Sequence, residues 1–174
     1  MKRSTQPNPC IFTPSAPRHS GRALEAKVMP RTIQRCLLIA AVLLAIAPAQ
    51  AKQQVFVPED DGQISFVMPS GNIGCIYTPR GGTPTYQPAD GGPEISCDRI
   101  APTYVNVTLG PKSAAVLTKN PGEQGCCGGD NVFAYGNTAT FDGFVCSASD
   151  AGLICETPDK KHGLCLSRTR ALHY

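Results

Sequence analysis

Cysteine is the residue type in this chain with the most chemical potential. Structural zinc sites usually repeat a C-x2-4-C spacing, and disulfide oxidoreductases use C-x-x-C. The adjacent pair Cys126-Cys127 has neither spacing, so we expect no metal site and no cofactor. Disulfide bonds are the remaining use for the cysteines that follow residue 52. These are Cys75, Cys97, Cys126, Cys127, Cys146, Cys155 and Cys165.

One disulfide follows from the expected register of a β-hairpin. Residues 149–152 have the composition of a turn, with Asp early and Gly last. If these four residues form the loop, Ala148 faces Leu153 and Cys146 faces Cys155. Facing residues of antiparallel strands lie about 4.5 or 5.5 Å apart between Cα atoms, which is within the range of disulfides. The sequence therefore predicts a Cys146–Cys155 bond on the inner face of the hairpin.

The other bonds follow by elimination. Cys75 and Cys97 lie on expected strands on either side of one long loop, so we expect them to pair. Cys165 then takes either Cys126 or Cys127. The count of seven is odd, so one thiol stays free or pairs with a second copy of the chain, which would give a disulfide-linked dimer.

Histidine offers little support for catalysis. From residue 52 on, only His162 and His173 could act as a general base, and His173 is next to the C-terminal residue, where fraying is expected. His162 lies at an expected turn, where hydrogen bonding to the backbone is the favoured role. The chain has no G-x-S-x-G, P-loop or dinucleotide motif. We assign no catalytic residue, and a small hydrolase that uses His162 is the alternative.

Two arginines near the C-terminus form a second candidate. Arg168 and Arg170 have the spacing of residues on one side of a strand. A solvated sheet edge, where charge discourages strand pairing, is the favoured interpretation. An anion-binding pair is the alternative.

The elements that would position these residues are short strands separated by Gly- and Pro-rich turns. No stretch after residue 52 has convincing helical periodicity. We expect an all-β, all-antiparallel domain of about eight short strands, a small sandwich or partly open barrel stabilised by disulfides. Loops are expected at 78–93 and 120–130. Strands are expected within 63–77, 94–98, 103–109, 113–118, 131–135 and 138–141, followed by a meander over 144–167.

The first 51 residues have the pattern of an export signal. Arg31 and Arg35 precede an apolar run at 36–47, which is too short for a membrane-spanning helix, and Ala49-Gln50-Ala51 follows. We expect cleavage after Ala51, no stable membrane insertion afterwards, and a secreted or periplasmic protein. Residues 52–62 would be an N-terminal segment and 63–174 a single β domain. Whether translation starts at Met1 or Met29 stays open.

Removing this leader reverses the net charge. Residues 1–51 carry seven Lys or Arg and one acid, a net charge of +6, whereas 52–174 carry nine Lys or Arg and twelve acids, a net charge of −3. The exported part is therefore mildly acidic. This charge and the absence of a basic stripe argue against a nucleic-acid partner.

A set of short segments follows one pattern in order: 69–75, 97–98, 134–136, 143–147, 152–153 with Cys155, 162–163 and 166–168. Together they resemble a family of small exported, disulfide-bearing bacterial domains of unknown function. The resemblance implies export and a disulfide-bearing domain, but no activity. Members usually have an apolar or aromatic residue in place of Cys165 and often a further cysteine between Cys97 and Cys126, so Cys165 is interpreted as a substitute partner for the Cys126-Cys127 pair.

Three functions are consistent with these observations. The leading hypothesis is a non-enzymatic binding or inhibitor module whose loops at 78–93 and 120–130 contact a protein or an envelope component. The hydrolase that uses His162 is the second. The third is a structural envelope protein that dimerises through the odd cysteine.

Overall fold

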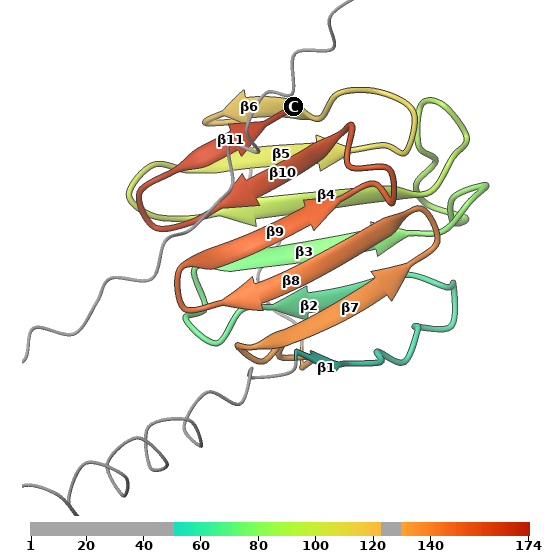
Figure 1. The fold of residues 1–174 in the computed structure, drawn as a ribbon. Coiled ribbons are helices and arrows are strands. Elements are labelled where there is room, and N and C mark those ends of the chain that lie inside the picture. Colours follow the sequence, from blue (N-terminus) through green and yellow to red (C-terminus); the bar gives the residue numbers. More distant parts are fainter. Residues whose placement is uncertain (1–50, 123–129) are drawn as a thin grey trace, which may run out of the picture. The chain divides into compact units, whose positions relative to one another are not determined.

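The computed structural model of the chain describes residues 51–122 and 130–174. These residues form two β-sheets that lie face to face (Figure 1). One sheet has the order β1 (Lys52–Gln53), β7 (Asn137–Phe141), β8 (Phe144–Ser149), β9 (Gly152–Glu156), β10 (Gly163–Leu166) and β11 (Ala171–His173). The other has the order β2 (Ile64–Val67), β3 (Ile73–Thr78), β4 (Glu94–Arg99), β5 (Val105–Leu109) and β6 (Val116–Lys119).

This architecture confirms the predicted all-β sandwich. Two details differ from the expectation: the described residues form eleven strands, and not all pairs are antiparallel. β1 pairs with β7 in parallel, and Val67 forms an isolated parallel bridge with Val132. Two-residue strands such as β1 carry too little pattern for a sequence to reveal them. No helix among the described residues has the length and apolar character needed to span a bilayer.

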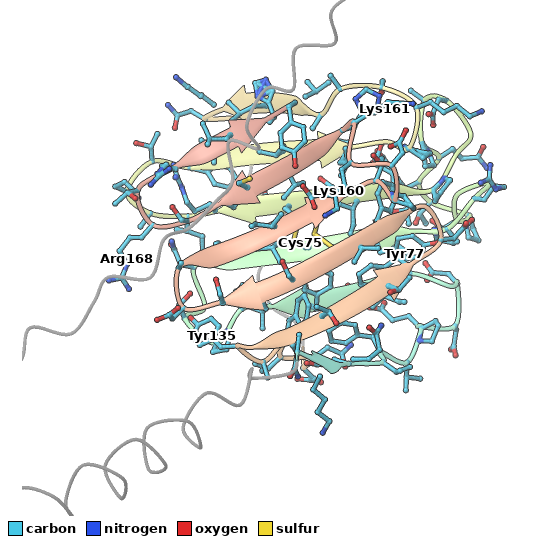
Figure 2. The ribbon with its side chains drawn as sticks, viewed as in Figure 1. Cys75, Tyr77, Tyr135, Lys160, Lys161 and Arg168 are labelled. Atoms are coloured by element: carbon cyan, nitrogen blue, oxygen red, sulfur yellow. A yellow bond between two sulfur atoms is a disulfide. The ribbon has the colours of Figure 1, made fainter. Side chains whose placement is uncertain are left out.

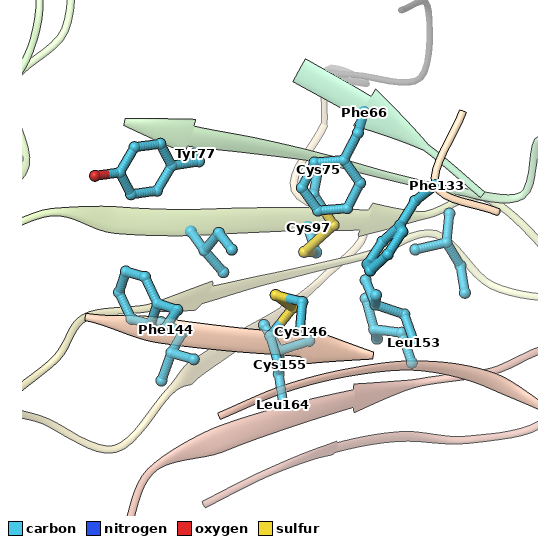
Figure 3. Packing of buried hydrophobic residues seen from close by; sticks show 14 of the residues in the cluster. Phe66, Cys75, Tyr77, Cys97, Phe133, Phe144, Cys146, Leu153, Cys155 and Leu164 are labelled. Atoms are coloured by element: carbon cyan, nitrogen blue, oxygen red, sulfur yellow. A yellow bond between two sulfur atoms is a disulfide. The ribbon is translucent and has the colours of Figure 1, made fainter. Parts of the chain in front are cut away.

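The core lies between the sheets because side chains alternate along each strand. In β5, Val105, Val107 and Leu109 are buried, whereas Asn106 and Thr108 lie on the outer face. The same alternation in the other long strands places an apolar face of each sheet against the other. Figure 3 shows these side chains filling the space between the sheets.

Aromatic rings fill one part of this core. Phe56 stacks on Phe66 with centroids 5.3 Å apart, and Phe133 meets both edge-on at 5.6 and 5.5 Å. Phe141 stacks on Phe66 at 5.7 Å and on Tyr77 at 5.1 Å. Such pairs stabilise a fold beyond their buried area. Phe56, from the segment before β2, therefore belongs to the same core as the sheets.

Both predicted disulfides between described cysteines are present. Cys75 and Cys97 are register partners on β3 and β4, and Cys146 and Cys155 are register partners on β8 and β9. The Cα atoms are 4.1 Å apart in each pair. All four residues are buried, and Figure 3 shows one bond on each sheet, within the core.

The third predicted bond lies partly outside the described residues. Cys165 is buried on β10 and is disulfide-bonded. Cys126 and Cys127 lie outside the described residues, so the pairing of Cys165 with either of them stays a prediction.

The β8–β9 hairpin has a shorter loop than the sequence suggested. Ser149 pairs with Gly152, so only residues 150–151 form the turn. A loop that is shorter by one residue on each side leaves the register of β8 and β9 unchanged. The predicted Cys146–Cys155 bond is therefore confirmed although the loop length was wrong. Glycine is needed at 152 because φ is +142° and a Cβ atom would lie 2.3 Å from the carbonyl oxygen of Leu166.

Residues 131–135 do not form the predicted strand. Asn131 accepts the N–H of Val67 through its carbonyl at 2.9 Å, and the N–H of Phe133 donates to the carbonyl of Val67 at 2.9 Å. The chain then turns at Gly136, where φ is +83°. The β-prone composition of this segment is explained by the burial of Phe133 in the core. A single inward side chain can be buried without continuous hydrogen bonding of the backbone to a neighbouring strand.

The C-terminus is also more ordered than expected. β11 pairs with β10, and Tyr174 exchanges two backbone hydrogen bonds with Gly163, at 2.9 and 3.0 Å. His173 is thus part of a strand and is not frayed. Its exposed side chain lies at the edge of the sheet.

Candidate functional site

His162 lies at the turn between β9 and β10. Its N–H donates to Oγ1 of Thr157 at 3.2 Å, and its carbonyl accepts the N–H of Thr157 at 2.9 Å. The imidazole Nδ1 is buried and has no hydrogen-bond partner. A catalytic base has to hydrogen-bond its nucleophile, and among the described residues no hydroxyl or thiol is hydrogen-bonded to this Nδ1. The contacts of His162 are those of a turn residue.

The same turn is closed by Asp159. Its carboxylate accepts the hydroxyl of Thr157 at 2.7 Å and pairs with the ammonium of Lys161 at 2.9 Å. The hydrogen bonds from Lys161 and Thr157 lower the pKa of Asp159 well below its usual range. These contacts stay within the exposed turn and explain its shape without a ligand.

Arg168 and Arg170 do not share a strand, contrary to the sequence-based expectation. Both lie in the connection from β10 to β11, where Oγ of Ser167 accepts the N–H groups of Thr169 and Arg170. The residue pattern suggested a strand, but β10 ends at Leu166 because Ser167 closes this turn. Arg168 instead lines a pocket at the end of the sandwich (Figure 2).

A larger concavity lies on the outer face of the β2–β6 sheet. We call it the groove; its volume is about 410 Å3, within the range of ligand sites. Outward-facing residues of β3, β4 and β5 form its floor. Its lining consists of Gln63, Ile76, Thr78, Thr85, Tyr86, Glu94, Ser96, Asp98 and Asn106.

A second hollow adjoins the groove. It has a volume of about 340 Å3 and shares Glu94 with the groove. Asp90, Thr108 and Ser113 contribute further polar groups to it. The outer face of this sheet is therefore hollowed on both sides of Glu94, which gives room for an extended ligand.

Asp98 is the centre of a hydrogen-bond network on the floor of the groove. It is only 4% exposed. Its Oδ1 accepts the hydroxyl of Tyr104 at 3.1 Å and the amide of Asn106 at 2.9 Å. Asn106 also donates to Oγ of Ser96 at 3.0 Å and accepts the hydroxyl of Thr108 at 3.1 Å. The floor is thus a set of polar side chains already fixed in position.

The 79–93 loop forms one wall of the groove. Its tip is folded back by hydrogen bonds in which the N–H of Thr83 donates to the carbonyl of Tyr86, and the N–H of Tyr86 donates to Oγ1 of Thr83. Glycine is required at 82, since a Cβ atom would lie 2.5 Å from the carbonyl oxygen of Tyr86. These contacts hold the partly exposed ring of Tyr86 at the rim.

Tyr86 is tied to the sheet by its hydroxyl. The hydroxyl donates to Oε1 of Glu94 at 2.6 Å. This hydrogen bond, together with burial, raises the pKa of Tyr86 to about 12, so the hydroxyl stays protonated at neutral pH. The rim therefore offers an aromatic face beside a carboxylate.

The spacing of the two carboxylates bears on the chemistry of the groove. Glu94 and Asp98 lie on the same face of β4, four residues and about 13 Å apart along the strand. The acid pairs of glycosidases lie about 5 to 9.5 Å apart. Both carboxylates are also engaged by hydroxyl or amide donors. The arrangement suits hydrogen bonding to the hydroxyl groups of a ligand better than hydrolysis of a glycosidic bond.

No family model, curated protein or solved structure matches the chain. The resemblance noted in the sequence thus stays a prediction. Within the described residues, no cluster of three or more His, Cys, Asp or Glu could hold a metal ion.

Sequence reasoning missed the groove. It anticipated the 78–93 loop as a contact surface but not the strand residues beneath it, such as Asp98 and Asn106. One signal was available in β4: its outer positions are the polar residues Glu94, Ser96 and Asp98, whereas two of its three inner positions are apolar. Such an outer face is common on solvated sheets, so this pattern alone could not identify a site.

Proposed function

We propose that this protein is an exported, non-enzymatic binding module that holds an uncharged glycan of the cell envelope in the groove. The observation that carries the proposal is the network around Asp98, a nearly buried carboxylate fixed by Tyr104 and Asn106 on the floor of an open groove. A solvated sheet face has no need of such a fixed arrangement.

The chemistry of the lining favours a sugar. Each sugar hydroxyl both donates and accepts a hydrogen bond, and the groove offers carboxylates, amides and hydroxyls to match. Tyr86 adds an aromatic face at the rim, against which the C–H face of a sugar ring can pack. The adjoining hollow supports a ligand of more than one sugar unit.

Export is part of the same proposal. Two disulfides are typical of a protein from an oxidising compartment. β1 begins at Lys52, so cleavage after Ala51 would leave every described strand intact.

We expect the mature protein to begin at Lys52. The signal pattern places the cleavage site directly after Ala51, and the measurement is the intact mass of the protein recovered from periplasm or medium. A full-length product found in the cytosol would contradict this expectation.

We expect the protein to bind uncharged saccharides on a microarray of bacterial envelope polysaccharides. Tyr86→Ala and Asn106→Ala should each weaken binding of the strongest hit at least tenfold, because each removes a group that contacts the ligand, at a cost of about 1.5 kcal/mol or more. Isothermal titration of the purified saccharide gives the affinities.

Thr140→Ala is the matched control. Thr140 is an exposed position on β7, on the other sheet, and its replacement should leave affinity unchanged. Thermal unfolding of each variant shows whether the fold is kept. Absence of any saccharide signal, or equal affinity of all three variants, would overturn the proposal. Binding of a protein but of no saccharide would also overturn it and would indicate that the partner is a protein.

A further inference from the structure

A further pocket lies at the end of the sandwich, where four connections meet. Its volume is about 220 Å3, enough for a ligand of amino-acid size. The connections are those between β2 and β3, before β7, between β8 and β9, and between β10 and β11. Figure 2 shows Tyr135 and Arg168 from two of these connections at the same end of the domain.

The pocket carries two opposite charges that do not neutralise each other. Asp150 and Arg168 both line it, both are exposed, and no ion pair joins them. Oppositely charged side chains of one pocket can each pair with a complementary group of a ligand. A ligand with adjacent ammonium and carboxylate groups fits this arrangement.

A buried arginine lies directly behind the wall of this pocket. Arg99 is only 5% exposed, and it is the register partner of Ile73, which lines the pocket. Its guanidinium donates to the carbonyls of Ser167 and Thr103, both at 3.1 Å, and its Nε is buried without a partner.

No carboxylate among the described residues pairs with Arg99, although a buried charge is normally paired. Burial lowers the pKa of Arg99, which means that its positive charge is destabilised where it lies. A ligand carboxylate in the pocket would bring a negative charge next to Ser167 and would offset that cost.

Hydroxyl groups complete the anion side of the pocket. Oγ of Ser70 accepts the N–H of Asn72, and Oγ of Ser167 accepts two backbone N–H groups. A hydroxyl that only accepts still has its own proton to donate. Both serines line the pocket, together with Tyr135, so three hydroxyls can donate to a carboxylate there.

From these observations we propose that the end pocket binds a small zwitterion, namely a free amino acid. Arg168 and the serine hydroxyls hold the carboxylate, Arg99 supports it through its charge, and Asp150 holds the ammonium. This site is separate from the groove and does not depend on the glycan proposal.

The test is an NMR titration of the protein with the common L-amino acids and their D-enantiomers. At least one should shift the amide signals of Ser70, Asp150 and Arg168 in a saturable manner. The N-acetyl and amide derivatives of that amino acid, which lack one charge each, should bind at least tenfold more weakly.

Variants separate the two charged contacts. Arg168→Gln and Asp150→Asn should each weaken binding of the amino acid at least tenfold, because each removes one pairing charge. Arg170→Gln removes the same charge from the same connection but not from the pocket lining, and it should bind as the wild type does.

Three results would overturn the proposal. They are no saturable shift with any amino acid, equal binding of acetate or phosphate alone, or unchanged affinity in both Arg168→Gln and Asp150→Asn. Binding of glycans to the groove would be unaffected by any of these results, so the two proposals fail separately.

Discussion

Replacing Cys146 and Cys155 together by alanine should lower the free energy of unfolding by about 3 kcal/mol. The bond closes a loop between residues that are 9 apart in sequence, and loop entropy alone gives about 2.7 kcal/mol for such a loop. Loss of buried sulfur from the core adds to this cost. Urea denaturation measures the change.

The Cys75→Ala, Cys97→Ala double variant provides the comparison. Its bond spans residues 22 apart, for which loop entropy gives about 3.4 kcal/mol, so this variant should be slightly less stable. Loss of these two bonds, about 6 kcal/mol, approaches the whole stability of a typical domain. Reduction also breaks the bond of Cys165 and should therefore unfold the protein. A reduced protein with an unchanged unfolding midpoint would show that packing alone holds the sandwich.

Phe133→Ala should cost about 4 kcal/mol of unfolding free energy. Phe133 is fully buried, and its ring meets Phe56 and Phe66 edge-on. Deletion of a buried phenylalanine ring typically costs 3 to 5 kcal/mol because a cavity remains. Urea denaturation again gives the value.

Two further variants serve as controls for Phe133→Ala. Phe133→Leu keeps most of the volume and should cost about 1.5 kcal/mol. Tyr135→Ala removes a ring that is 42% exposed and should cost about 0.5 kcal/mol or less. A loss below about 1 kcal/mol for Phe133→Ala would mean that this segment does not anchor the core.

Local pattern was enough to predict the parts of the fold that depend on neighbours in sequence. The period-2 alternation and the turn at 149–152 placed Cys146 opposite Cys155, and the structure has that pairing. The same alternation places Phe144 and Leu153 on the face that carries Cys146 and Cys155, and both are fully buried.

Features that depend on distant segments could not be predicted in the same way. Phe133 is buried by Phe56 and Phe66, which lie far from it in sequence, so its β-prone surroundings suggested a strand. The end pocket joins Ser70 with Arg168 only because the two sheets stack. Arg99 is an inward-facing charge on a strand, and no sequence pattern marks such an exception.

The central claim is that the groove around Asp98 is the ligand site, and NMR mapping tests it most directly. The protein is titrated with the envelope saccharide that binds best on the microarray. We expect saturable shifts in the amide signals of Ser96, Asp98 and Asn106, together with Tyr86. Shifts confined to the outer face of β7, β8 and β9, on the opposite sheet, would contradict the claim.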